Sequence, residues 1–207
     1  MKKNKIGLFG GSFNPIHNGH IDVSKIIFKK LELDELFFIP TYVSPHKLNQ
    51  EHASSKDRIK MINLAINKID DFKVCDYETK KNSISYTIDT INFFNSKYPT
   101  SEIYFLAGSD IINKLEYWYK INEIFKKCNF IIFSRPKNES IDLLIKNSML
   151  TKQQKVFILK NKIDIKTDDI SSTKIRFHIS NGKSIKKFIP INVYDYIIEK
   201  ELYKNFR

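Results

Sequence analysis

Short apolar runs alternate with longer amphipathic segments along most of this chain. Apolar runs predict strands at 6–9, 36–39, 72–75, 103–106 and 130–133, and a similar run predicts a further strand at 156–159. Between them, apolar residues recur at helical spacing, which predicts helices at 18–31, 54–69, 87–97 and 110–127. This alternation is typical of parallel strands joined by crossover helices. The sequence therefore predicts an α/β fold, with a Rossmann-like, doubly wound parallel sheet of about five to six strands and helices on both faces.

Two more helices are expected near the C-terminus. Ser171 can cap a helix over 171–180 that stops at Asn181 and Gly182, and Pro190 precedes a helical pattern at 192–202. No repeat or low-complexity linker interrupts the 207 residues, a length that suits one domain. We therefore expect a single domain, 1–207, with a small C-terminal helical part at about 171–207.

The net charge of +12 raises the question of a nucleic-acid partner. The 35 Lys and Arg residues are scattered, with no run longer than a pair, so we expect no nucleic-acid partner. A basic nucleic-acid-binding protein is the alternative from a different functional class. No stretch approaches the roughly 20 apolar residues of a membrane span, and 6–9 is too short for a signal peptide, so we expect no membrane partner and a cytoplasmic location.

The first predicted strand runs into the turn GGSFNPIHNGH at residues 10–20. Gly10 and Gly11 allow the backbone to bend sharply and to approach a ligand closely. His17 and His20 are spaced i, i+3, which places both imidazoles on one face at the start of the predicted helix. Unpaired N–H groups and positive potential gather at such a helix end. The turn therefore predicts a site for polyphosphate oxygens.

Other phosphate and metal motifs are missing from this turn. It is not Gly-x-Gly-x-x-Gly, which disfavours a dinucleotide-binding oxidoreductase, and no Gly-Lys-Ser/Thr follows, which excludes a Walker loop. His17 and His20 have no third ligand nearby at metal spacing, so we expect no protein-held metal.

The turn resembles the signature of the H-x-G-H nucleotidyltransferase superfamily, and residues 170–176 are similar to its I-S-x-T-x-x-R motif. The resemblance implies that an acceptor phosphate attacks the α-phosphorus of ATP and expels pyrophosphate, with Mg²⁺ carried by ATP rather than by the protein. It implies catalytic roles for His17, His20 and Arg176. The implied ATP contacts are Gly10, Gly11, Ser12, Phe13, Gly108, Asp110, Arg135, Ser171 and Thr173.

Within that superfamily, nearly the whole chain is similar to bacterial nicotinate-nucleotide adenylyltransferases. The similarity is carried, in order, by segments 45–47, 85–87, 107–110, 117–119, 134–136 and 193–203. It implies that the substrates are ATP and nicotinate mononucleotide, and that the product is deamido-NAD, made in NAD biosynthesis.

The same similarity implies an acceptor site. Trp118 would stack on the nicotinate ring, Thr87 and the backbone of Tyr119 would hold its carboxylate, and Asp110 would hold a ribose hydroxyl. His46 or Lys47 would lie near the acceptor phosphate. Nicotinamide mononucleotide and phosphopantetheine stay open as alternative acceptors, although phosphopantetheine enzymes usually carry Thr where His17 stands. A homo-oligomer is also open, and residues 137–169 match no known motif.

Overall fold

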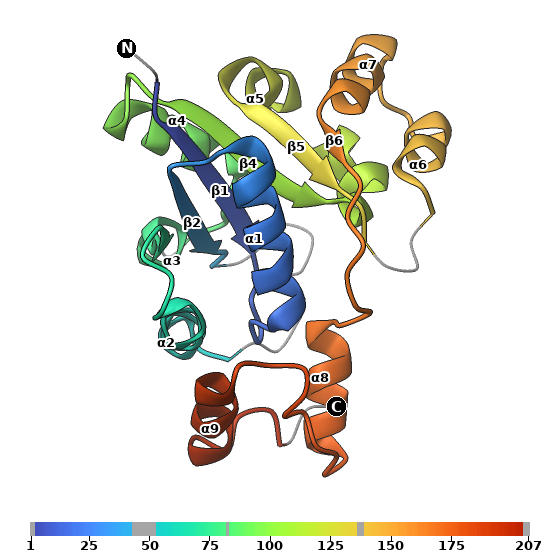
Figure 1. Cartoon of the computed structure of the whole chain (residues 1–207). Coiled ribbons are helices and arrows are strands. Elements are labelled where there is room, and N and C mark those ends of the chain that lie inside the picture. Colours follow the sequence, from blue (N-terminus) through green and yellow to red (C-terminus); the bar gives the residue numbers. More distant parts are fainter. Residues whose placement is uncertain (1–2, 43–52, 82, 136–138, 205–207) are drawn as a thin grey trace.

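The protein is described by a computed structural model that covers residues 3–42, 53–81, 83–135 and 139–204. Its strands form one parallel sheet in the order β3-β2-β1-β4-β5-β6, as Figure 1 shows. The strands are β1 (Lys5–Gly11), β2 (Glu35–Pro40), β3 (Phe72–Val74), β4 (Glu102–Gly108), β5 (Asn129–Phe133) and β6 (Lys162–Ile163). The chain winds outward from β1 to one edge and then from β4 to the other. The predicted doubly wound, Rossmann-like sheet is therefore confirmed.

The helices connect these strands and form the C-terminal part. They are α1 (Asn18–Leu31), α2 (Ser55–Ile66), α3 (Tyr77–Lys81), α4 (Thr87–Lys97), the 3₁₀ helix η1 (Ser109–Tyr117), α5 (Ile121–Lys127), α6 (Ile141–Asn147), α7 (Lys152–Lys160), α8 (Ser172–Ser180) and α9 (Ile191–Glu199). The predicted helix at 110–127 is divided into η1 and α5. Lys120 adopts a left-handed backbone conformation at this break, with a φ of 56°.

One predicted strand is wrong. Residues 156–159 belong to α7, and the sixth strand is the two-residue β6 that follows. Thr151 and Gln154 form a capping box at the start of α7, and Ile158 is buried while Val156 and Leu159 are exposed. A four-residue apolar run cannot distinguish these two structures by its pattern.

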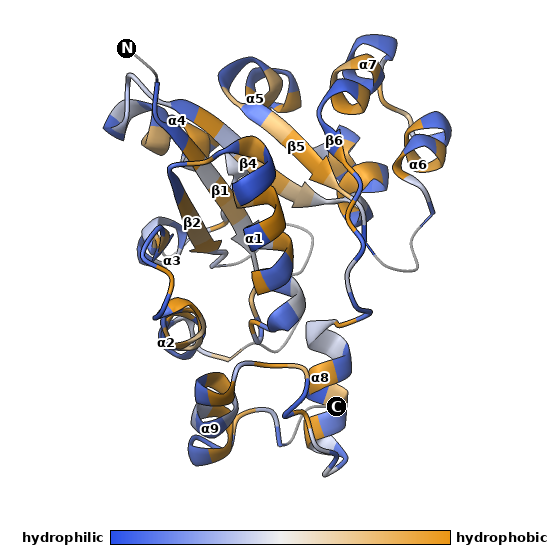
Figure 2. Ribbon diagram, viewed as in Figure 1, coloured by the Kyte–Doolittle hydropathy of each residue, from blue (hydrophilic) through white to orange (hydrophobic). Residues whose placement is uncertain are grey.

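Neighbouring strand residues face opposite sides of the sheet and build two cores. Leu36 and Phe38 pack with α1, α2, α8 and α9, whereas Phe37 and Ile39 pack with α4, η1, α5, α6 and α7. This alternation follows from the two-residue period of a strand. Strand β5 is apolar after its first residue, Asn129, because both of its faces are covered, while α1 alternates apolar and hydrophilic residues (Figure 2).

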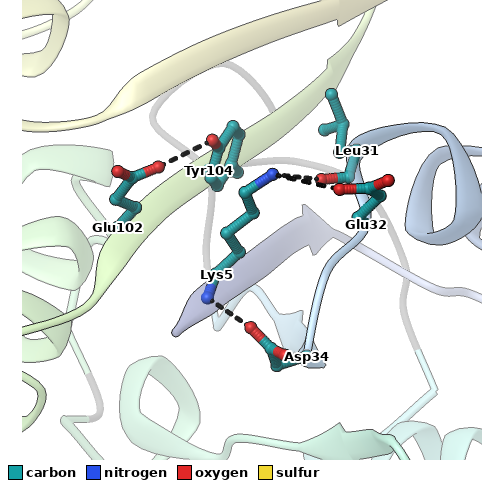
Figure 3. Close-up of polar contacts among 6 residues, drawn as sticks. All are labelled: Lys5, Leu31, Glu32, Asp34, Glu102 and Tyr104. Atoms are coloured by element: carbon teal, nitrogen blue, oxygen red, sulfur yellow. Dashed lines mark hydrogen bonds and ion pairs between the residues drawn. The ribbon is translucent and has the colours of Figure 1, made fainter. Parts of the chain in front are cut away.

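Polar contacts hold the edge of the sheet where β1 and β4 begin (Figure 3). The backbone N–H of Lys5 donates to Asp34 Oδ2 at 2.8 Å, and Lys5 Nζ donates to the carbonyl of Leu31 at 3.0 Å. On β4, the hydroxyl of Tyr104 donates to Glu102 Oε2 at 2.9 Å. These contacts lie at the end of the sheet opposite the carboxyl ends of the strands.

Helices α8 and α9 lie beyond the carboxyl ends of the strands (Figure 1). The hydroxyl of Tyr196 on α9 donates to Asp57 Oδ1 on α2 at 2.8 Å. The C-terminal helices are thereby held next to these carboxyl ends. None of the helices in the described ranges is long and apolar enough to span a membrane.

Candidate active site

A cavity of about 490 Å³ opens where the carboxyl ends of β1 and β4 meet. The strand order reverses between these two strands, and α/β proteins bind ligands at such a point. All the predicted site residues that the structure describes line this cavity: Gly10, Gly11, Ser12, Phe13, His17, His20, Thr87, Gly108, Asp110, Trp118, Tyr119, Arg135, Ser171, Thr173 and Arg176. His46 and Lys47 lie outside the described residues. Segments nearly 170 residues apart in the sequence are thus brought to one place.

The turn at residues 10–20 forms one wall of the cavity. Its conformation is set by Phe13, which has a φ of 45° and buries its ring edge-on against Phe9 at 5.6 Å between centroids. A Cβ on Gly11 would lie 3.0 Å from that ring, which explains the need for glycine there. Because the Phe13 ring is in the core, only the backbone of this residue is well placed for a ligand.

His17 and His20 stack on each other at the start of α1. Their ring centroids are 3.7 Å apart and their planes differ by 28°. The backbone N–H of His17 donates to His20 Nδ1 at 3.3 Å. A neutral His20 therefore carries its proton on Nε2 and can donate it to a ligand. The i, i+3 spacing of the pair gives the predicted arrangement.

Both imidazoles are neutral at physiological pH in the free protein. Burial, and then the positive charge of Arg135, lower the pKa of His17 from 6.5 to about 3. Burial, followed by His17 and Arg135, lowers the pKa of His20 well below 6.5. The pair thus offers hydrogen-bond donors without permanent charge, and an anionic ligand would raise both pKa values.

Helix α8 forms the wall that faces this turn and is hydrogen-bonded to it. Ser172 Oγ donates to the carbonyl of Pro15 at 2.8 Å, and Arg176 Nη1 donates to the carbonyl of Asn14 at 2.8 Å. Ser171 caps the helix by accepting the N–H of Lys174. The N–H groups that open α8 and the buried Arg176 guanidinium therefore supply positive potential next to the imidazoles.

An ion pair between Arg135 and Asp110 lies at the end of β4. Arg135 Nε and Asp110 Oδ1 are 2.8 Å apart, and both side chains are partly exposed to the cavity mouth. A Cβ on Gly108 would overlap both of these atoms. Glycine at this position therefore lets the ion pair lie against the strand end.

Aromatic residues line the other part of the cavity. Trp118 is half-buried and packs edge-on against Phe105 and Phe130, with centroid distances of 6.2 and 5.9 Å. The rings of Tyr86 and Tyr119 lie 5.0 Å apart, and Tyr86 precedes Thr87 at the start of α4. Trp118 thus packs against the core and also lines the cavity, where a flat ligand ring can contact it.

The model of the cytidylyltransferase-like family matches residues 8–177. The chain belongs to the cytidylyltransferase-like family. The match begins in β1 and ends in α8, so it includes both walls of the cavity. The fold of this family member is the α/β nucleotidyltransferase fold that the sequence predicted.

Relatives and solved structures are similar over nearly the whole chain. A Clostridium botulinum (strain Okra / Type B1) protein named "Probable nicotinate-nucleotide adenylyltransferase" is 40% identical over 199 residues, covering 95% of this chain and 98% of the relative. The Plasmodium falciparum nicotinic acid mononucleotide adenylyltransferase complexed with NaAD has a TM-score of 0.77 at 23% identity, covering 97% of this chain and 98% of that one. Its complex with APC has a TM-score of 0.74 at 22% identity, with coverage of 97% and 98%.

The described part of this cytidylyltransferase-like chain contains no group of three or more His, Cys, Asp or Glu residues that could hold a metal ion. The ligands that Mg²⁺ prefers are oxygens, and nucleotide phosphates provide them. The donors that surround the cavity instead suit phosphate oxygens: imidazoles, guanidinium groups and a helix N-terminus.

Sequence reasoning missed two buried charged residues near the cavity, Arg58 on α2 and Glu78 on α3. Arg58 could have been found, because it continues the apolar i, i+4 row of Ile62 and Ile66 that faces the core. Glu78 gives no comparable signal, since the five-residue α3 is too short for a clear period. Asn14, which lines the cavity, and Tyr203 were also not predicted as site residues. The hydroxyl of Tyr203 donates to Asn14 Oδ1 at 2.9 Å.

Proposed function

We propose that this chain is an adenylyltransferase that joins AMP from ATP to nicotinate mononucleotide. A phosphate oxygen of the acceptor forms a bond to the α-phosphorus of ATP, the bond from that phosphorus to the bridging oxygen breaks, and pyrophosphate leaves. The products are deamido-NAD and pyrophosphate. The observation that carries the proposal is one cavity lined by the stacked His17 and His20, by the start of α8 and by Trp118. The name of the 40% identical relative supports the same reaction.

The phosphate side of the cavity would act by positioning and by charge stabilisation. His17 and His20 would donate hydrogen bonds to phosphoryl oxygens as negative charge grows on them. Arg176, Ser171 and Thr173 would hold the β- and γ-phosphates from the opposite wall. No protein nucleophile is needed, because the acceptor phosphate itself attacks.

The remaining ATP contacts would come from the strand ends. The backbone from Gly10 to Phe13 would approach the phosphates. Gly108, Asp110 and Arg135 would bind the rest of the nucleotide, with Asp110 on a ribose hydroxyl. In the free protein Asp110 is paired with Arg135, so a ribose would share or replace that contact.

The acceptor would lie on the aromatic side. The electron-poor nicotinate ring would stack on Trp118, and its carboxylate would meet Thr87 and the backbone N–H of Tyr119. His46 or Lys47 would contact the acceptor phosphate. These residues follow β2 in the sequence, and β2 ends beside the cavity.

ATP is used by enzymes of this kind together with a divalent metal, and we propose Mg²⁺ bound to the triphosphate. The ion would neutralise phosphate charge and would keep several waters. We further propose that residues 1–207 act as one domain with a helical part at 171–207, since α8 contributes directly to the cavity.

The test is pyrophosphate release from ATP and Mg²⁺ with each acceptor in turn: nicotinate mononucleotide, nicotinamide mononucleotide and phosphopantetheine. We expect turnover with nicotinate mononucleotide above nicotinamide mononucleotide, and none with phosphopantetheine. The reverse order would overturn the choice of acceptor. Absence of turnover with all three, together with tight binding to single-stranded RNA or DNA, would favour the nucleic-acid-binding alternative.

A further inference from the structure

Arg58 is a buried cation that binds backbone carbonyls. Its side chain is 2% exposed, and its Nη1 donates to the carbonyls of Ser12 and Thr41, both at 2.8 Å. Its Nε donates to the carbonyl of Ala53 at 3.3 Å, and its Nη2 donates to Ser55 Oγ at 3.2 Å. Ser12 belongs to the phosphate-side turn. Arg58 therefore joins that turn to the end of β2 and the start of α2, and it does not itself line the cavity.

Glu78 is a buried acid on the acceptor side of the same cavity. It is 8% exposed, and its Oε1 accepts a hydrogen bond from Thr90 Oγ1 at 2.6 Å. Burial raises the pKa of its carboxyl group, and the hydroxyls of Ser85 and Thr41 lower that pKa by favouring the charged form. Thr90 lies on α4, so Glu78 holds the first turn of the helix that begins at Thr87.

Thr41 connects the two groups. Its backbone N–H donates to the carbonyl of Gly11 at 3.0 Å, its carbonyl accepts from Arg58, and its hydroxyl contacts Glu78. The next residue, Tyr42, donates its N–H to Ser85 Oγ at 3.3 Å. A continuous set of hydrogen bonds therefore runs from Ser12 on the phosphate side, through residue 41, to Ser85 on the acceptor side.

We propose that Arg58 and Glu78 are positioning residues that couple nucleotide binding to acceptor binding through Thr41. The proposal rests on the function proposed above. A nucleotide that contacts the backbone at Gly11 and Ser12 also acts on residue 41, because the carbonyls of Gly11 and Ser12 are hydrogen-bonded to Thr41 and Arg58. A shift of this backbone toward the position that the acceptor needs would lower the cost of acceptor binding. By linkage, the acceptor strengthens nucleotide binding by the same factor.

The alternative is that the two residues only stabilise the fold. Removing one partner of a buried hydrogen-bonded charge lowers stability whether the residue has a positioning role or only a structural one. A lower melting temperature therefore does not distinguish the two roles. The ratio of the acceptor affinities with and without bound nucleotide does distinguish the two roles. A general loss of stability leaves that ratio unchanged in the fraction of protein that is folded.

The experiment is titration calorimetry with nicotinate mononucleotide, with and without a saturating ATP analogue that has a methylene group between the α- and β-phosphorus atoms. In the unmodified protein we expect the analogue to strengthen acceptor binding about 10-fold. In Arg58→Lys and in Glu78→Gln we expect this factor to fall to about 1–2, while acceptor binding without the analogue changes less than about threefold. Lys60→Met on α2 and Glu199→Gln on α9 are matched controls, since both residues are exposed and neither lines the cavity.

Thr41→Val keeps the shape of the side chain and the backbone contacts and removes only the hydroxyl, so it tests the part of the coupling that runs through Glu78. Arg58→Gln, which keeps a hydrogen-bond donor, tests the other part if Arg58→Lys fails to fold. Folded variants that retain the unmodified protein's factor, or a factor of 1 in the unmodified protein, would overturn the proposal. Failure of the proposed function looks different: the unmodified protein would release no pyrophosphate with nicotinate mononucleotide. The same affinity ratio would then be measured with whichever of the other two acceptors supports turnover.

Discussion

The rings of His17 and His20 lie 3.7 Å apart in a stack, and the backbone N–H of His17 donates to Nδ1 of His20. Phe9 and Phe13 pack edge-on against the His20 ring, at 6.0 and 5.1 Å between centroids. His17 and His20 thus have aromatic carbon on one side and line the cavity on the other. This enclosure explains why the two imidazoles are neutral and why their donors are fixed in direction before any ligand arrives.

Replacing His20 by alanine should remove one fixed donor from the reaction centre. We expect His20→Ala to fold and to lower kcat by a factor of about 10² to 10³, the usual cost of one such donor. Steady-state pyrophosphate release measures the effect, and His178→Ala on α8, which lies outside the cavity, is the control. Turnover close to that of the unmodified protein would exclude the histidine pair from the mechanism.

The buried histidines should make the free protein sensitive to mild acid. Their pKa values are lower in the folded protein than the ordinary value of 6.5, so the unfolded chain binds more protons below that pH. Their contribution to stability is complete above pH 6.5 and is lost as the pH falls below it; for His17 the loss continues down to about pH 3. We expect a slope of up to about 1.4 kcal/mol per pH unit for each histidine.

Urea denaturation between pH 7 and pH 5.5 measures this slope, because most carboxylates do not titrate in that range. The double variant His17→Asn, His20→Asn should show a flatter profile. An equal pH dependence of the unfolding free energy in the two proteins would show that His17 and His20 do not cause the sensitivity to acid.

A methyl group on Gly108 should displace the ion pair at the end of β4. The added Cβ would overlap Arg135 Nε and Asp110 Oδ1, so one of these side chains must move. We expect Gly108→Ala to raise KM for ATP at least about 10-fold, equivalent to about 1.4 kcal/mol of lost nucleotide binding. Arg135→Ala removes the guanidinium that the added methyl group would overlap. Gly108→Ala should therefore raise KM for ATP by a smaller factor in a protein that already carries Arg135→Ala. An unchanged KM would contradict the placement of this pair at the nucleotide.

The Trp118 ring should contribute to acceptor binding and much less to ATP binding. We expect Trp118→Ala to raise KM for nicotinate mononucleotide about 10-fold or more, the usual effect of losing an aromatic stacking partner, and to change KM for ATP little. Trp118→Phe keeps an aromatic face and should stay within about threefold. Because Trp118 also packs on Phe105 and Phe130, melting temperatures are needed for both variants. Equal increases in both KM values would point to a general loss of structure.

Chelation should stop turnover without destabilising the free protein. We expect EDTA to abolish pyrophosphate release and Mg²⁺ to restore it, since the ion enters with the triphosphate. The melting temperature without ATP should be the same with and without EDTA. A drop in that temperature would reveal a metal held by the protein itself.

The sheet could be predicted because its strands are short and apolar on both faces, as in Phe37 and Phe38. The turn with His17 and His20 could be predicted because its residues are neighbours in the sequence. Residues 156–159 were assigned wrongly, because in a short apolar run the capping pair Thr151 and Gln154 decides the structure. Arg58 and Glu78 depend on contacts between distant segments, which no local pattern encodes.

Asn14 is fixed by partners that are very distant in sequence. Its carbonyl accepts from Arg176, 162 residues away, and its side chain accepts from Tyr203, 189 residues away. All strands of the described sheet end by Ile163, before either partner. During synthesis, all of these strands therefore emerge before the phosphate turn can gain these contacts. A fragment that stops at residue 170 would retain the strands and yet have no second wall against which to hold a triphosphate.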